Sequence, residues 1–281
     1  MMEGVSENLE LPGSGGRPLS VRIERPADGP VLAWALFAHC FTDGEGGEPT
    51  RRIARALAVH GIGLLCVDMD APGACIGERA SSGFSTLVGD LVAAGDWLRR
   101  HHGGPRLLLG HSLGGAAVLA AAGEIPEVSA IATIAAPADP AHVRRQLGDT
   151  MGGDMDHGPV SAELDAGPGQ IQHEVLDDIE RWELTRRVSR LGRALLVFHA
   201  PLDRIVVIEH ARRLFEAAKH PKSFISLDAS DHALSDAADA GYVAAILEAW
   251  VSRYVVLQQG QQRGSAAGPR SQGPQAPTRD G

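Results

Sequence analysis

The most informative part of this 281-residue chain is residues 107–115, which read Leu-Leu-Leu-Gly-His-Ser-Leu-Gly-Gly. The three leucines predict a buried strand, and the small-residue run over 113–125 predicts a helix. Between them, Ser112 has one glycine two residues before it and another two residues after it. With 34 glycines in the chain the spacing alone is a weak signal. Its position between a strand and a helix favours a sharp turn whose crowded backbone excludes side chains at the flanking positions.

On both sides of this turn, short apolar runs alternate with longer amphipathic runs. The predicted strands cover residues 19–26, 31–40, 62–69, 107–109, 128–136, 194–199 and 223–227. The predicted helices cover residues 48–60, 84–102, 113–125, 208–219 and 241–254. Strands that alternate with helices predict an α/β fold, with a mostly parallel sheet and helices on both faces.

The pattern also divides the chain. Residues 1–18 read as an N-terminal lead-in, and residues 19–256 as one domain. Residues 138–190 break the alternation and are polar, so we expect a cap or lid insertion there, with a helix over 173–187. Residues 257–281 are rich in Gln, Gly and Pro and are predicted to be a disordered tail, because they bury too little apolar surface to offset ordering.

Composition excludes several classes of protein. The formal net charge is −9, from 26 basic and 35 acidic residues, which disfavours nucleic-acid binding. The first residues show no pattern of a signal peptide, so none is expected, and the longest apolar run, 31–38, is too short to cross a membrane. Three cysteines match no zinc or redox spacing. We therefore expect a cytoplasmic protein that acts on a small molecule, and the oligomeric state stays open.

No cofactor or metal is expected. A Gly/Asp-rich stretch in the insertion carries Asp154, Asp156 and His157. These residues fit a solvated loop better than a metal centre, because no second cluster completes a coordination set. Residues 73–77 form no phosphate-binding glycine loop, so the sequence gives no support for a nucleotide.

A serine at such a turn needs a base, and the base needs an acid to orient it. In a fold of this kind the chain order is serine, acid, histidine. His232 follows the strand predicted over 223–227, and Asp203 follows the strand over 194–199, so both lie at carboxyl ends of strands. Three other acids compete for the orienting role: Asp139, Asp228 and Asp231.

An oxyanion formed on the substrate would need two backbone N–H donors. One is expected from Leu113, directly after the serine, and the other from Phe41, in the loop after the strand over 31–40. His111 and His199 flank the candidates, and we expect them to pack against neighbouring strands.

Three short segments, 39–42, 110–117 and 219–224, resemble bacterial α/β-hydrolase modules that are often fused to an OsmC-like domain. The resemblance covers roughly residues 19–255. It implies the α/β-hydrolase fold, an esterase-like or serine-aminopeptidase-like activity, Ser112 as nucleophile, Asp203 as acid and His232 as base. The OsmC-like domain is missing from this sequence. The loop after Asp68 also departs from the pattern, with Ala71 in place of a glycine and Cys75 in place of a serine.

The expected function is a serine hydrolase that transfers the acyl group of a small carboxylic ester, thioester or amide. Two alternatives stay open at this point. The same three residues would also support a perhydrolase or a cofactor-free haloperoxidase-like enzyme, with peroxide as acyl acceptor. A non-catalytic binding protein that keeps the fold is the other alternative.

Overall fold

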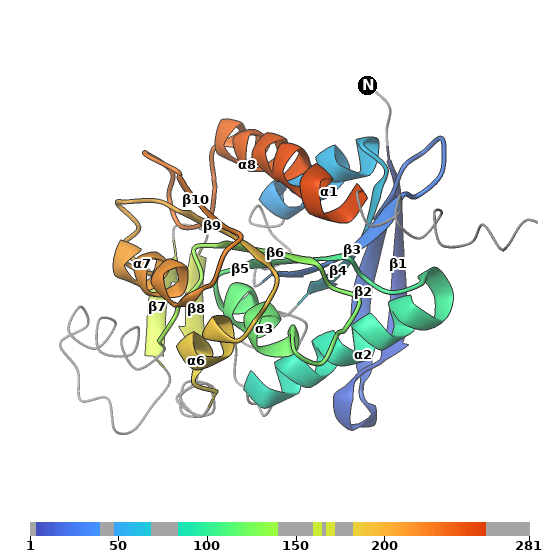
Figure 1. Ribbon diagram of the computed structural model, residues 1–281, viewed down its shortest axis with the longest axis horizontal. Coiled ribbons are helices and arrows are strands. Elements are labelled where there is room, and N and C mark those ends of the chain that lie inside the picture. Colours follow the sequence, from blue (N-terminus) through green and yellow to red (C-terminus); the bar gives the residue numbers. More distant parts are fainter. Residues whose placement is uncertain are drawn as a thin grey trace, which may run out of the picture.

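The computed structural model describes residues 4–39, 48–68, 84–139, 160–164, 167–171 and 182–256. They form a central sheet with helices on both faces (Figure 1). The strands of the sheet are β1 (Val5–Pro12), β2 (Pro18–Arg25), β3 (Ala33–His39), β4 (Ile62–Asp68), β5 (Leu107–His111), β6 (Ala130–Ile134), β9 (Ala194–His199) and β10 (Lys222–Ser226). The helices are α1 (Glu48–Val59), α2 (Phe84–His102), α3 (Leu113–Ala121), α6 (Leu184–Ser189), α7 (Ile208–Ala217) and α8 (Ala237–Val251), with short turns η1 (Ser14–Gly16) and η3 (Ser252–Val256).

The eight strands lie in the order β1-β2-β4-β3-β5-β6-β9-β10. β2 runs antiparallel to β1 and β4, and every other neighbouring pair is parallel. The predicted mostly parallel sheet is thus confirmed. Because the parallel strands share one direction, the carboxyl ends of β3, β5, β9 and β10 lie at the same edge of the sheet, where ligands bind in open α/β folds.

The central strands β3, β5, β6 and β9 are buried on both faces of the sheet, which explains their nearly continuous apolar sequences. Within β3, Leu36 faces a core under α2, α3, α6 and α7, whereas its neighbour Phe37 faces a second core under α1 and α8. Figure 1 shows α1 and α8 together on one side of the sheet and α2, α3 and α6 on the other. The two cores pack against both faces of the sheet and fix the positions of the strand ends. The strand ends in turn position the side chains that follow them.

The N-terminal residues differ from the sequence prediction. Residues 1–18, expected to be a lead-in, contain β1, which pairs with β2 along its whole length. β1 is an edge strand whose residues are mostly exposed, with Leu11 buried. An edge strand of this kind lacks the apolar run by which buried strands are recognised, and this is why the pattern missed it.

The region predicted as an insertion is described only in part. β7 (Val160–Leu164) and β8 (Gly167–Ile171) form a separate two-stranded sheet. The helix predicted over 173–187 corresponds to α6, which begins at Leu184, and residues 172–181 lie outside the described residues. The predicted tail, 257–281, also lies outside them. None of the helices in the described part of the chain has the length and apolar character needed to cross a membrane.

Candidate active site

Ser112 lies at the turn between β5 and α3, in a backbone conformation that side chains rarely adopt, with φ 53° and ψ −125°. Its N–H donates to the carbonyl of Ile134 on β6, 2.9 Å away. A methyl group on Gly110 would lie 2.4 Å from the carbonyl oxygen of Gly114, and one on Gly114 would lie 2.4 Å from that of Ala38. Only glycine fits at either position, so the glycine spacing in the sequence is a steric requirement of this turn.

The three side chains singled out from the sequence meet at this turn. The imidazole Nε2 of His232 lies 3.0 Å from Ser112 Oγ, and its Nδ1 lies 2.7 Å from Asp203 Oδ2. Ser112 and His232 are 120 residues apart in the chain. The strand ends of β5, β9 and β10 bring them together, because these strands are parallel and close in the sheet. The arrangement allows the hydroxyl to donate to Nε2 while the Nδ1–H donates to the carboxylate.

Asp203 is held as a buried carboxylate. Its Oδ1 accepts hydrogen bonds from the backbone N–H groups of Ile205 and Val206, at 2.8 and 2.9 Å. Burial alone would raise the pKa of Asp203, but the hydrogen bond and charge of His232, with the two N–H groups, outweigh burial and lower the pKa. Both carboxylate oxygens thus have partners, and the side chain is fixed in orientation and in charge.

The competing acids have other partners or positions. Asp139 pairs with Arg213, with Nη1 and Oδ2 2.9 Å apart. Asp231 accepts a hydrogen bond from the N–H of Ser235 at 2.9 Å, as a turn-capping residue does. Asp228 is exposed. Of the four acids considered from the sequence, Asp203 is the one whose carboxylate contacts His232.

Two buried histidines support the loops that carry the acid and the base. His111 Nε2 lies 2.7 Å from the carbonyl oxygen of His232, and His199 Nε2 lies 2.6 Å from that of Val206. A carbonyl only accepts, so each Nε2 carries the proton. Burial, followed by the nearby charge of His232, lowers the pKa of His111 to about 3. From the sequence, both residues were expected to pack against neighbouring strands. Only their closeness in the chain to Ser112 and Asp203 indicated a role in the site.

Of the two predicted oxyanion donors, the structure describes Leu113 but not Phe41. Leu113 is the first residue of α3, and the first N–H groups of a helix lack an acceptor inside the helix. Phe41 lies outside the described residues, as do Asp154, Asp156 and His157. β3 ends at His39 directly beside β5, since the pairing register joins Ala38 with Gly110. The end of β3 therefore lies next to the turn at Ser112.

Comparisons with known proteins agree with the fold. The family model described as alpha/beta hydrolase fold matches residues 36–156. The esterase domain of a Rhodothermus marinus protein is 42% identical, with 89% of this chain and 99% of that chain covered and a TM-score of 0.75. Est1E from Butyrivibrio proteoclasticus is 16% identical, with 88% of this chain and 98% of that chain covered and a TM-score of 0.70.

Dienelactone hydrolase from Anabaena variabilis is 18% identical, with 90% of this chain and 99% of that chain covered and a TM-score of 0.62. At such low identity the last two show the fold alone. A search of curated protein sequences finds no match. The family assignment rests on the 42% identity to the esterase domain, which extends over 99% of that domain. The chain belongs to the α/β-hydrolase family and is a hydrolase.

Proposed function

We propose that the protein is a serine hydrolase that cleaves a small carboxylic ester, thioester or amide by acyl transfer to Ser112. The observation that carries the proposal is the continuous chain of contacts from Ser112 Oγ through the imidazole of His232 to Asp203. Esters are the favoured substrates, because the relative at 42% identity is an esterase domain.

In the proposed reaction, Ser112 Oγ attacks the acyl carbon while its proton moves to Nε2 of His232. Asp203 keeps the Nδ1–H of the imidazole in place and stabilises the imidazolium that forms. The imidazolium then protonates the leaving group, and an acyl-enzyme ester on Ser112 remains. Water, activated by the same imidazole, attacks this ester, which releases the acid and restores the serine.

The oxyanion would be held at the N-terminus of α3. The N–H of Leu113 lies directly after the nucleophile and is assigned as one donor, and the N–H of Phe41 is proposed as the second. The partial positive charge of the helix N-terminus adds to this stabilisation. Both roles belong to the backbone, so side-chain substitutions at these two positions test them poorly.

His111 and His199 act in this proposal as positioning residues. His111 holds the backbone of His232, and His199 holds the carbonyl of Val206, whose N–H in turn binds Asp203. Since burial keeps the pKa of His111 near 3, His111 stays neutral and does not compete for the serine proton at neutral pH. A buried histidine therefore supports each of the two residues: His111 supports the base His232, and His199 supports the acid Asp203 through Val206.

Labelling with a fluorophosphonate tests the nucleophile. The wild type and Ser112→Ala are treated in parallel, followed by intact mass measurement and peptide mapping. A single adduct on Ser112 that is absent from the variant is the expected result. The absence of any adduct on folded wild-type protein would contradict the proposal and favour the non-catalytic alternative. Acyl transfer to water and to peroxide, measured side by side on one ester, separates hydrolysis from perhydrolysis.

The acid is tested with a matched pair of variants, Asp203→Asn and Asp139→Asn. Loss of the Asp203 carboxylate is expected to lower kcat on the order of 10⁴-fold, because the imidazole loses its required tautomer. Asp139 pairs with Arg213 in a partly exposed position, and its loss is expected to leave kcat near the wild-type value. Equal kcat values for the two variants, measured on the same ester, would show that the acid is wrongly assigned.

A further inference from the structure

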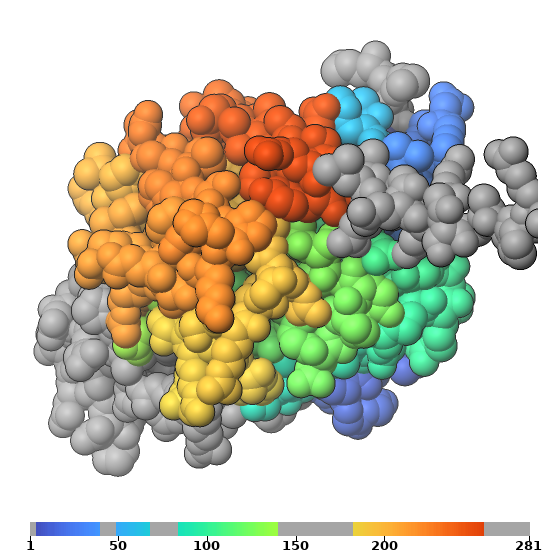
Figure 2. Space-filling model, viewed as in Figure 1, coloured from blue at the N-terminus to red at the C-terminus, as the bar shows by residue number. Residues whose placement is uncertain are grey.

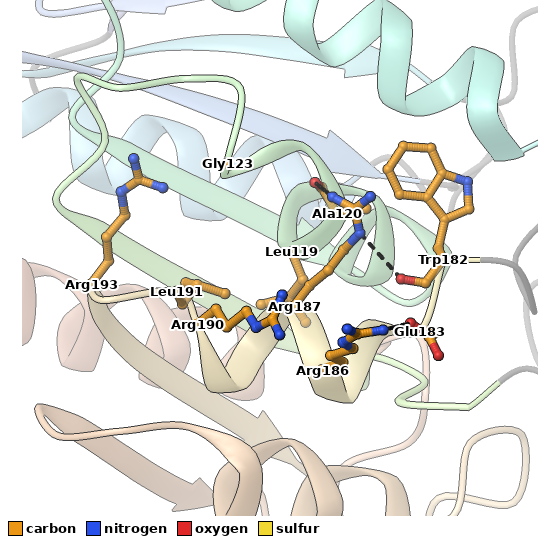
Figure 3. Close-up of a pocket in the computed structure, with 10 residues that line it drawn as sticks. All are labelled: Leu119, Ala120, Gly123, Trp182, Glu183, Arg186, Arg187, Arg190, Leu191 and Arg193. Atoms are coloured by element: carbon orange, nitrogen blue, oxygen red, sulfur yellow. Dashed lines mark hydrogen bonds and ion pairs between the residues drawn. The ribbon is translucent and has the colours of Figure 1, made fainter.

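A cavity lies between α3 and α6, apart from the candidate active site. Its volume is about 510 Å³, within the usual range for small-molecule pockets (Figure 3). Figure 2 shows the gold surface of α6 on the face toward the viewer. The lining residues are Leu119, Ala120, Gly123, Trp182, Glu183, Arg186, Arg187, Arg190, Leu191 and Arg193.

The cavity is at the far end of α3 from the nucleophile. Ser112 precedes the first turn of α3, whereas Ala120 belongs to its last turn. At 1.5 Å per residue this separation is roughly 12 Å along the helix axis. A molecule of a few atoms cannot occupy both places, so the cavity is not an extension of the site at Ser112.

Positive charge is concentrated at the cavity. Four arginines, all from residues 186–193, line it together with a single acid, Glu183, although the whole chain has a net charge of −9. Arg186 forms an exposed ion pair with Glu183, at 2.9 Å. Guanidinium groups gathered at one cavity repel one another, and an anion bound among them would relieve this repulsion.

Two of the four arginines already have structural roles. Arg187 lies over the indole ring of Trp182, 4.3 Å from its centre, and its Nε donates to the carbonyl of the same residue at 3.2 Å. Arg187 also donates to the carbonyl of Ala120, and Arg193 donates to that of Ala122. These carbonyls belong to the C-terminal end of α3, which cationic side chains stabilise.

Arg190 has no such role within the part of the chain that the structure describes. Its side chain is exposed, and no hydrogen bond or ion pair joins it to another described residue. Figure 3 shows it running along α6 toward Arg186. A guanidinium has five N–H donors in a planar fork that matches the oxygens of a carboxylate or phosphate. Arg190 is therefore the residue at which an anionic head group would bind.

Apolar residues also line the cavity. Leu119 and Leu191 line it, and the position of Gly123 opens onto free space. Trp182 is held by a hydrogen bond of 3.1 Å from its indole N–H to Ser85 Oγ, on α2. A bare phosphate would leave most of this surface and volume unused. We infer that the cavity binds an organic anion, with its carboxylate or phosphate on Arg190 and its apolar body against the half-buried side chains of Leu191 and Trp182.

The inference is independent of the activity at Ser112 and is tested by binding. Isothermal titration calorimetry at physiological salt would use phenyl phosphate and benzoate as organic anions. Benzamide serves as the uncharged probe and inorganic phosphate as the bare anion. We expect binding of an organic anion, with weaker or undetectable binding of the other two probes. Equal affinity for inorganic phosphate would overturn the role of the apolar wall, and equal affinity for benzamide would overturn the role of charge.

Arg190→Gln removes the charge without touching a described contact, and Arg212→Gln is its control. Arg212 is exposed on α7, where it pairs with Glu216 at 3.0 Å, so its loss changes the net charge equally. We expect Arg190→Gln to weaken binding of the organic anion at least tenfold, or about 1.4 kcal/mol, and Arg212→Gln to leave it unchanged. Unchanged affinity in Arg190→Gln, equal losses in both variants, or no binding to the wild type would each overturn the inference.

Discussion

Replacing His111 by alanine would remove a hydrogen bond that connects two strand ends. In the folded protein, His111 Nε2 donates to the carbonyl of His232 over 2.7 Å, and both residues are buried. The variant leaves that carbonyl without this donor. An unsatisfied buried acceptor costs about 1–3 kcal/mol, and a small movement of the loop toward water lowers this cost. The imidazole of His232 would move with its backbone.

The effect on catalysis follows from the distances. Nε2 of His232 is 3.0 Å from Ser112 Oγ, and a hydrogen bond is lost at about 3.6 Å, so a shift of roughly 0.6 Å is enough to break it. Misplacement of a catalytic group by about 1 Å can lower the rate 10²-fold. We expect His111→Ala to lower kcat by about ten- to a hundredfold. KM should change little, because His111 contacts the catalytic base His232 and is not assigned a contact with the substrate.

The assay is steady-state hydrolysis of a chromogenic acetate ester, with urea unfolding measured on the same samples. His111→Gln is the rescue variant, since its amide can donate to the same carbonyl and should recover part of kcat. His210→Ala is the control: His210 is also fully buried, and its ring is hydrogen-bonded to a backbone group, the N–H of Ala138. A wild-type kcat in His111→Ala, or an equal loss in His210→Ala at equal stability, would refute the positioning role.

Three further predictions concern stability. Burial is the main cause that lowers the pKa of both His39 and His111 to about 3, whereas an unfolded histidine titrates near 6.5, so the unfolded state binds more protons between these values. Stability should therefore fall as pH is lowered from 6.5 toward 3, by about 2 kcal/mol per histidine at pH 5, and equal urea midpoints at pH 7.5 and 5 would contradict this. Gly114→Ala places a methyl 2.4 Å from a backbone oxygen and should cost about 3 kcal/mol or more, whereas Gly123→Ala enters open space and should be neutral or stabilising in a thermal melt. Because Ser112 has a φ of 53°, Ser112→Gly should be about 1–2 kcal/mol more stable than Ser112→Ala by urea unfolding, the reverse of the usual order.

Much of the fold was predictable because its signals are local. β9 (Ala194–His199) matches its predicted bounds, and the other predicted strands differ by a few residues. A strand buried on both faces must be apolar throughout, and a helix that covers it must repeat its apolar residues every three or four positions. β1 escaped detection since an exposed edge strand obeys neither rule.

The candidate site was predictable to the extent that its constraints are steric or topological. The turn at Ser112 excludes a Cβ at Gly110 and Gly114, and this exclusion is visible as sequence spacing. Asp203 and Asp139 both follow strands, and neither spacing nor composition separates them. Only the packed strand ends show that Asp203 reaches the imidazole of His232.

The sequence by itself therefore determined the strand and helix alternation of the domain, the turn at Ser112 and the identities of its candidate partners, because each depends on neighbours within a few residues. Only the tertiary structure decided which acid contacts His232, that His111 is hydrogen-bonded to its backbone across 121 residues, and that the arginines of residues 186–193 line a cavity against α3. These contacts join segments distant in the chain, and their distances follow from how the sheet and helices pack.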